Sequence, residues 1–477
     1  MGKGACGVAP HQAELKRNPG FLASLKDVTS FSSKSGEAEA AEKERILQAR
    51  QSMKAKKGEK TEFTWEEVEE HKHKYDCWIV IKGNVYDVTE FAPTHPGGRA
   101  IYSLGGRDAS DTFTAFHEPR TWSRLKEFKI GTVTEPDAKS TAVIKDFREM
   151  RNKMVADGLF ETSIPYYMWK VISTWGIYVA AAVVMNSFAD SVLGYLTSAM
   201  LLGLFWQQSG WLCHDFCHNQ VFKNRKLNAR FAFLLGPISQ GFSVDWWNNK
   251  HNTHHAVPNE IAGDTPVDPD IDTLPFIAWD MEMLRDASPT IRKIVSKQHY
   301  LVGPILFLAR MSWATQSFLN AVAITSIKET SGILAHYALM MAIPMYAGYS
   351  LLGAVGYLMV AQLFGGWFLG FVFMQSHNAM EVYDGEMDFA SAQLVSTRNI
   401  HFGPLNDWFA GGLNMQIEHH LFPTMPRHNL RKAARQVEEL CGRHGLVYEN
   451  VGWCSATCKV IARLHDIAKQ AHVVKAE

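Results

Sequence analysis

Long segments without charged residues alternate with charged segments along the chain, and the uncharged segments have lengths typical of membrane helices. Residues 171–189 and 191–213 contain no Asp, Glu, Lys or Arg, and only Asp190 separates them. Residues 331–376 form a third uncharged stretch, which is long enough for two helices with a turn near residues 349–353. A helix needs about 20 residues to cross the hydrocarbon core of a bilayer. The pattern therefore predicts four transmembrane helices in two hairpins.

Three other segments have helical patterns but are not expected to span. Residues 231–244 are too short, and residues 301–319 are interrupted by Arg310, so both are expected to be interfacial or packed helices. Residues 429–445 repeat apolar side chains at helical spacing, which predicts an amphipathic helix packed on the cytosolic domain.

Basic residues follow the first predicted hairpin, and by the positive-inside tendency they place that side in the cytosol. The second hairpin returns the chain to the same side. We therefore expect everything before the first span, the loop 214–330 and residues 377–477 to be cytosolic. The basic residues are Lys223, Arg225, Lys226 and Arg230.

Residues 61–135 have the pattern of a small soluble domain. Two apolar runs, 78–81 and 85–88, flank a Lys-Gly-Asn turn, which predicts a β-hairpin, and helical segments follow as far as His117. Residues 1–60 lack the apolar core of a signal peptide, and their content of Lys, Glu, Ala and Gln predicts a disordered or loosely helical tail.

Composition limits the partners more than the fold. Lys plus Arg equals Asp plus Glu at 48 residues each, so no charge excess favours a nucleic acid, and membrane contact must come from apolar segments. The seven cysteines are scattered without a Cys-x-x-Cys pair, which is typical of reduced thiols facing the cytosol. The 20 histidines are more informative because they cluster.

Three clusters have the spacing of metal half-sites. On a helix, residues three or four apart lie on one face, and imidazole is a ligand for iron, copper and zinc. Seven histidines exceed the four ligands of a structural zinc and are enough for two metal ions. All three clusters can converge at the cytosolic end of the helical bundle. They are His214 and His218; His251, His254 and His255; and Gln416, His419 and His420.

His377 is an eighth candidate ligand, because it stands at the cytosolic end of the fourth predicted span. His336 lies inside the third span and is expected to be a packed or hydrogen-bonded residue. Aromatic segments at 205–206, 246–247 and 365–367 either line an apolar tunnel beside the site or serve ordinary packing.

The clusters stand among further motifs that together resemble the membrane fatty-acid desaturase family, from about residue 61 to residue 450. The third cluster begins with Gln416 where most of that family has histidine, and this is typical of front-end desaturases, which act between an existing double bond and the carboxyl end. The resemblance implies that all eight histidines are di-iron ligands and that Gln416 is a catalytic residue at the edge of the metal site. The further motifs are Trp246-Trp247-Asn248-Asn249-Lys250-His251, His255-Ala256-Val257-Pro258-Asn259, Asp268-Pro269-Asp270-Ile271-Asp272-Thr273 and Leu421-Phe422-Pro423.

The segments His95-Pro96-Gly97-Gly98 and Phe113–His117 resemble those of cytochrome b5, which implies a haem b with His95 and His117 as axial ligands. Two histidine ligands leave no open coordination position, so this haem is expected to carry electrons rather than bind O2. No Gly-x-Gly-x-x-Gly fingerprint stands in a strand–helix context, so NADH would act indirectly, through a separate NADH-cytochrome b5 reductase.

These resemblances predict a multidomain protein. A tail (1–60) precedes a small α+β haem domain (61–135), and a linker and pre-membrane segment follows (136–165). An all-α membrane desaturase domain (166–450) has four transmembrane helices and a cytosolic helical cap that holds the di-iron site, and a C-terminal tail (451–477) ends the chain. The resemblance implies an integral membrane protein of the endoplasmic reticulum, with the haem and the di-iron site on the cytosolic face.

The implied reaction uses O2 and electrons from the haem to place a cis double bond in a fatty acyl chain, which would be carried by CoA or by a phospholipid. Segments 241–243, 250–255 and 411–420 are most similar to delta-6 desaturases, which implies a polyunsaturated C18 substrate. Delta-5 and delta-8 acyl desaturases, and a delta-8 sphingolipid long-chain-base desaturase, share much of this pattern. A di-iron hydroxylase and a membrane-anchored electron carrier are further alternatives, and the sequence leaves a homo-oligomer open.

Overall fold

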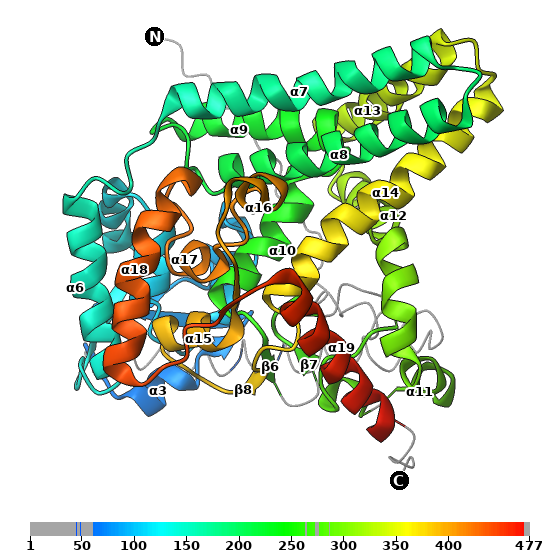
Figure 1. Cartoon of the computed structure of the whole chain (residues 1–477). Helices are drawn as coiled ribbons and strands as arrows, with labels where there is room; N and C mark the ends of the chain where they lie inside the picture. Colours follow the sequence, from blue (N-terminus) through cyan, green and yellow to red (C-terminus); the bar gives the residue numbers. More distant parts are fainter. Residues whose placement is uncertain are drawn as a thin grey trace, which may run out of the picture.

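Long helices form a layer across the top of Figure 1, and the shorter helices and three small sheets lie below it. The tail expected over residues 1–60 lies outside the described residues, apart from two helical positions. The computed structural model describes Glu44, Gln48 and residues 61–262, 265–271, 276–285 and 287–471.

The N-terminal domain is built on a mixed sheet with strand order β1-β5-β4-β3-β2. β1 pairs parallel with β5, and the other pairs are antiparallel. The predicted hairpin is confirmed, because Val80 pairs with Val85 and the turn residues Lys82 and Gly83 both have positive φ, as a type I′ turn requires. The strands are β1 (Glu62–Phe63), β2 (Lys72–His73), β3 (Asp76–Ile81), β4 (Asn84–Asp87) and β5 (Lys129–Val133).

Both faces of β3 are buried, which explains why its sequence shows no alternation of polar and apolar residues. Successive side chains of a strand point to opposite faces. Ile79 and Ile81 belong to one apolar cluster of the domain, and Trp78 and Val80 belong to another. The helical segments predicted after the hairpin are also confirmed, as η1 (Ala92–Thr94), α4 (Ala100–Ser103) and α5 (Ser110–Phe116). Helix α3 (Trp65–Glu69) before the hairpin and η2 (Pro119–Glu127) after His117 were not predicted.

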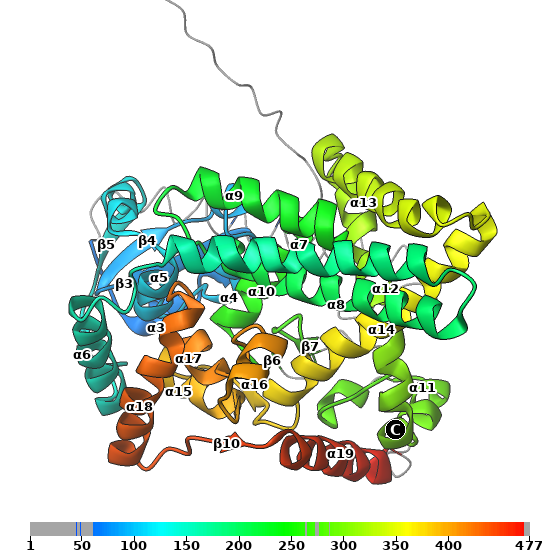
Figure 2. The same cartoon turned by 45° about the horizontal axis from the view of Figure 1, so that its top comes forward.

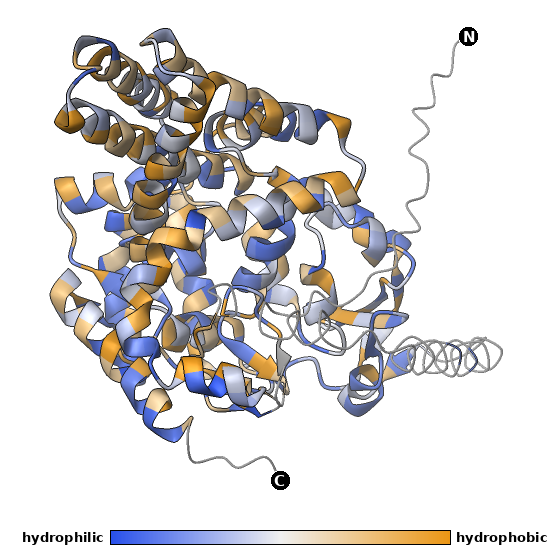
Figure 3. Cartoon of the chain, turned by 90° about the vertical axis from the view of Figure 1, so that its right-hand side faces the viewer, coloured by the Kyte–Doolittle hydropathy of each residue, from blue (hydrophilic) through white to orange (hydrophobic). Residues whose placement is uncertain are grey.

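The four long apolar segments each form one helix, with bounds close to those predicted. Orange, hydrophobic ribbon is concentrated on these helices in the upper part of Figure 3. Among the described helices, α7 and α14 are long and apolar enough to cross a membrane, whereas α8 and α13 fall short of the same hydropathy. Two of the four predicted spans are therefore supported by composition. The helices are α7 (Ile164–Ser187), α8 (Val192–Cys217), α13 (Ile327–Tyr346) and α14 (Leu351–Ser376).

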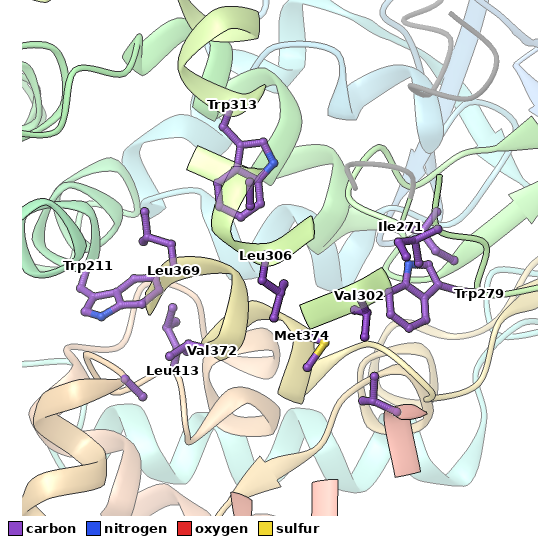
Figure 4. Packing of buried hydrophobic residues seen from close by; sticks show 14 of the residues in the cluster. Trp211, Ile271, Trp279, Val302, Leu306, Trp313, Leu369, Val372, Met374 and Leu413 are labelled. Carbon is purple, nitrogen blue, oxygen red and sulfur yellow. The ribbon is translucent and has the colours of Figure 1, made fainter. Parts of the chain in front are cut away.

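Helix α12 (Gln298–Ala323) is a packed helix, as the sequence predicts, and it lies between α14 and α19 (Trp453–Gln470). Figure 4 shows its side chains Val302, Leu306 and Trp313 meeting those of α14 in the largest apolar core. The Arg310 side chain that interrupts the apolar run is fully buried, and its guanidinium donates to the Gln362 side chain and the Gln240 carbonyl.

The segment expected to be a linker contains helix α6 (Ala142–Ala156), whose apolar face packs against α15 (Phe389–Ser396) and α18 (Arg427–His444). Helix α18 confirms the predicted amphipathic helix. The segment expected to be a C-terminal tail forms α19, which the prediction did not anticipate. The remaining elements are α9 (Arg225–Phe233), the π-helical η3 (Leu234–Gln240), α10 (Val244–Ala256), β6 (Glu260–Ala262), β7 (Thr265–Pro266), η4 (Glu282–Leu284), α11 (Pro289–Val295), β8 (Tyr383–Asp384), β9 (Asn399–Ile400), α16 (Pro404–Phe409), α17 (Gln416–Leu421) and β10 (Asn450–Val451).

Candidate metal centre

The eight candidate histidines come from four helices whose local sequences fix their ends. Helix α10 begins at Ser243, whose hydroxyl accepts the Trp246 N–H. Helix α17 follows a turn in which Gly411 has φ of 63° and lies so close to Trp211 that a Cβ would collide with the indole. The histidines are His214 and the C-cap His218 of α8; His251, His254 and His255 of α10; the C-cap His377 of α14; and His419 and His420 of α17.

The histidines separate into two adjacent buried groups, in each of which the candidate ligand nitrogens all lie within 4.8 Å of one another. The Gln416 side-chain amide lies 2.7 Å from His377 Nε2 and thereby joins the smaller group. The five-histidine group is His214, His218, His251, His255 and His419, and the three-histidine group is His254, His377 and His420.

The donor set fits metal ions. In the five-histidine group, His214 Nε2 lies 2.9 Å from His419 Nε2. Among the residues that the structure describes, Nε2 of His218 and Nε2 of His420 are buried without a hydrogen-bond partner. A buried nitrogen left unpaired costs about 1–3 kcal/mol, and a cation that accepts its lone pair would remove that cost. Two groups of imidazoles suit two iron ions.

Outer residues orient the ligands of the three-histidine group. His254 Nδ1 lies 2.8 Å from Asp268 Oδ2, His420 Nδ1 lies 2.8 Å from Gln393 Oε1, and His377 Nδ1 lies 3.1 Å from the Ser396 carbonyl oxygen. When the Nδ1–H donates to such an acceptor, Nε2 presents its lone pair toward the neighbouring imidazoles. These contacts fix both the tautomer and the ring direction that a metal ion requires.

Burial also keeps most of these rings neutral. Desolvation and the neighbouring imidazoles lower the pKa of His255, His419 and His420 well below the usual value, so the rings are unprotonated at neutral pH. His254 differs, because the Asp268 carboxylate raises its pKa overall although burial acts to lower it. Neutral imidazole is the form that binds a metal ion.

The N-terminal domain contains a pair of facing imidazoles, separate from the two histidine groups. The rings of His95 and His117 lie 6.0 Å apart between centroids. His95 Nδ1 lies 3.3 Å from the Gly98 carbonyl oxygen and His117 Nδ1 lies 3.0 Å from that of Phe113, which leaves both Nε2 atoms to act as ligands. Burial lowers the pKa of His117 to about 4, so it too is neutral at pH 7. The pair fits the two axial positions of a haem.

A narrow pocket opens beside the three-histidine group. It reaches His254, His377 and Gln416, and His251 of the other group also borders it. Polar side chains gather at its histidine end, and its apolar walls are mostly aromatic, so it suits an unbranched apolar chain with the reacting carbons beside the histidines. Of the aromatic segments that the sequence offered for a tunnel, only 246–247 lines this pocket. The apolar walls include Trp246, Trp247, Trp313, Gly370, Phe373 and Met374.

Fold and site together define a metalloenzyme with its own haem-binding domain. Residues 190–451 match the family model for fatty acid desaturase, and residues 64–134 match that for the cytochrome b5-like heme/steroid binding domain. The chain belongs to the fatty acid desaturase family. It is a cytochrome b5-fused front-end desaturase, an O2-dependent oxidoreductase of a membrane-bound family that acts on fatty acyl chains.

Curated relatives agree on this family over most of the chain. An acyl-lipid (9-3)-desaturase of Physcomitrium patens is 42% identical over 93% of this chain and 85% of its own length. A delta(8)-fatty-acid desaturase of Euglena gracilis is 38% identical over 78% of this chain and 90% of its own. A delta(6)-fatty-acid desaturase of Caenorhabditis elegans is 34% identical over 76% and 90%, respectively.

The structure brings together all of the predicted metal-site residues, including His377 and Gln416, and places His95 opposite His117. His336 lies outside both histidine groups, and its Nδ1 is 3.0 Å from the Ile238 carbonyl oxygen, as expected for a packed residue. The sequence did not identify Gln393 as a partner of His420, because the glutamine lies on α15 and belongs to no recognisable motif.

Proposed function

We propose that this protein places a cis double bond at the delta-6 position of polyunsaturated C18 acyl chains. The observation that carries the proposal is the apolar pocket that ends at His254, His377 and Gln416. The relative at 42% identity, a (9-3)-desaturase, supports a delta-6-like position, and the relative from Caenorhabditis elegans is a delta(6) enzyme. The substrate would be carried by CoA or by a phospholipid.

In this proposal the eight histidines hold two iron ions, one associated with each group, and Gln416 completes the edge of the three-histidine group. When bound, the iron pair supplies O2 activation and the removal of one hydrogen from each of two adjacent carbons. The chain's own residues do the positioning. The indoles of Trp246 and Trp247 hold the acyl chain and exclude water, and Asp268 holds His254 in place.

His95 and His117 would hold haem b, which receives electrons from NADH through a separate cytochrome b5 reductase. The haem domain would comprise residues 61–135 and the desaturase domain residues 166–450, with the predicted linker largely docked through α6.

We further propose that α8 and α13 cross the membrane together with α7 and α14, in the endoplasmic reticulum and with both metal sites on the cytosolic face. Exposed apolar side chains support this arrangement, because Val192 and Leu193 of α8 are 76% and 75% exposed and Leu334 of α13 is 57% exposed. Such surfaces are suited to lipid contact rather than to water.

Expression in yeast fed linoleic (18:2) or α-linolenic (18:3) acid tests the proposal, with gas chromatography of the products and mass spectrometry to locate the new double bond. We expect a new double bond at carbon 6. Because both acids already carry a double bond at carbon 9, a parallel culture is fed eicosadienoic acid (20:2, double bonds at carbons 11 and 14). A new double bond at carbon 8 of that acid would favour the second candidate, a delta-8 activity, which the 38% identity to the Euglena gracilis enzyme supports. No new double bond from any fed acid or long-chain base would contradict the desaturase activity in both forms.

A further inference from the structure

The end of helix α5 is held by hydrogen bonds from α6 and from the desaturase part of the chain. The last carbonyls of a helix lack partners within it. Here three consecutive carbonyls are satisfied from outside, and two of the donors are cationic, which also suits the negative end of the helix dipole. The Thr114, Ala115 and Phe116 carbonyl oxygens accept hydrogen bonds from Arg151 Nη2 at 3.1 Å, Thr424 Oγ1 at 3.2 Å and Arg225 Nη2 at 2.9 Å.

A second contact seats the His95-to-Gly98 loop on α10, the helix of the second histidine cluster. Asn252 Nδ2 donates to the Gly97 carbonyl oxygen at 3.1 Å, and Gly98 lies so close to Asn249 that a Cβ would collide with it. Figure 2 shows α4 and α5 beside α10. An ion pair of Arg107 with the buried Glu260 carboxylate, at 2.6 and 2.9 Å, holds the same side of the domain.

Phe116 lies between these two contacts and reaches from the haem-ligand segment to the candidate iron ligands. It is covalently adjacent to His117, the proposed haem ligand. Its ring lies 5.9 Å from the ring of His255 and 6.3 Å from that of His218, and both histidines are buried members of the five-histidine group. Among the residues that the structure describes, Phe116 is the side chain whose ring contacts join the haem-ligand segment directly to the candidate iron ligands.

We propose that Phe116 couples the haem to the five-histidine group, so that electrons enter the iron pair at His218 and His255 rather than at the three-histidine group. This inference rests on the ligand assignment of the proposed function. Electron transfer slows steeply as the distance between donor and acceptor increases. A packed aromatic ring replaces solvent along that path with bonded atoms, through which the electron transfers more readily.

The electron balance needs two such transfers in each turnover. In each transfer the haem iron goes from ferrous to ferric and one iron of the pair goes from ferric to ferrous. An NADH-linked flavoprotein reductase returns one electron to the haem each time. The two electrons, the two hydrogens of the acyl chain and two protons from solvent together convert O2 to two waters.

The test uses the full-length holoenzyme with Phe116→Leu, which keeps apolar volume but removes the ring. The haem is reduced without oxygen by dithionite, the protein is mixed with O2 and acyl substrate, and haem absorbance is followed in a stopped-flow instrument. We expect haem reoxidation to slow about tenfold or more. Haem content, haem midpoint potential and iron content should equal those of the wild type, and Phe116→Trp should restore most of the rate.

Phe63→Leu is the matched control, because Phe63 is buried in the other apolar cluster of the same domain and away from His117. Wild-type reoxidation in Phe116→Leu, or equal slowing in Phe63→Leu, would overturn the proposal. Slowing together with lost hydrogen-exchange protection of α10 would show that Phe116 serves docking alone and would also overturn it. Two further measurements separate the claims. Reoxidation that does not depend on iron in iron-depleted wild type would overturn the coupling, whereas full iron content in His218→Ala and in His255→Ala would reject the ligand assignment, whatever Phe116 does.

Discussion

The two histidine groups share the same ligand chemistry but face different neighbours. The five-histidine group meets the haem domain through Phe116, which contacts His218 and His255. The three-histidine group borders the apolar pocket at His254 and His377 and has Gln416 as a fourth polar member. The pocket also borders His251 of the five-histidine group, but two of its three histidines and Gln416 belong to the other group. We infer that electrons arrive beside the five-histidine group and that the acyl chain lies mainly beside the three-histidine group.

The residues that hold the two histidine groups in place also differ. The five-histidine group is anchored by the buried Asp215, which lies 3.2 Å from His214 Nδ1 and forms an ion pair with Arg427. The three-histidine group is held by a neutral amide, a backbone carbonyl and one carboxylate, Asp268. In the proposed function, Gln416 would give the three-histidine group an edge with a weaker ligand, where O2 and a hydrocarbon chain could approach.

Removal of a candidate ligand from either group should have the largest effect. His419→Ala in the five-histidine group and His420→Ala in the three-histidine group should each lower desaturation by at least about a thousandfold, because each would deprive one of the two proposed irons of an imidazole and O2 activation would need both irons. Iron content by mass spectrometry should fall by one or two ions per chain while the haem spectrum is unchanged. Measurable turnover in one of these variants would show that its group is dispensable and would break the comparison.

Gln416→Ala should lower activity about a hundredfold with the fold retained, because it removes a polar group at the pocket edge without removing an imidazole. Gas chromatography of yeast lipids measures the loss, and thermal unfolding checks the fold. Iron content should stay near that of the wild type, which distinguishes this variant from the histidine variants. Wild-type turnover in Gln416→Ala would refute a role for Gln416 in the site.

Asp268→Asn should weaken metal binding about tenfold, because the amide still accepts a hydrogen bond from His254 but carries no charge. This is the low end of the effect expected when a partner of a metal-binding histidine is changed. The measurement is iron retention during titration with a chelator. Asp466→Asn on the exposed face of α19 is the control, since Asp466 contacts only Lys469 and Gln470 among the described residues. Equal iron retention in the two variants would remove Asp268 from the set that orients the site.

Most residues of this site could be predicted from their spacing in the sequence. His214 and His218 share a helix face whatever the rest of the chain does, so the clusters can be recognised from the order of residues alone. The division into two groups cannot, because it depends on how four helices cross. The contacts of Gln393 and Phe116 were missed for the same reason, because each reaches the site across more than 25 residues of sequence. Gln393 stands in no motif, and the motif that contains Phe116 indicates the haem site rather than a contact with His218 or His255. The count of membrane spans is supported for only two helices, because polar residues such as Gln207 and Gln208 in α8 and Lys328, Glu329 and His336 in α13 lower the hydropathy of these helices.

Gly370→Ala should give the smallest effect, and it should act on the pocket side alone. Gly370 lines the pocket, and an added Cβ would lie 2.9 Å from Leu306 Cδ2 and 3.4 Å from Ala309 Cβ, so the wall between α12 and α14 must shift by a few tenths of an ångström. The added methyl group faces α12 and reaches the pocket only by displacing α14, so the change in selectivity should be about tenfold, at the low end of what one methylene inside a pocket gives. We therefore expect the ratio of 16-carbon to 18-carbon products from yeast fed both acids to rise, with haem reoxidation unchanged. Gly176→Ala on α7 is the matched control, because a Cβ there meets nothing within 4 Å. An unchanged product ratio, or slower haem reoxidation in Gly370→Ala, would mean that the two sides of the iron pair are not separate.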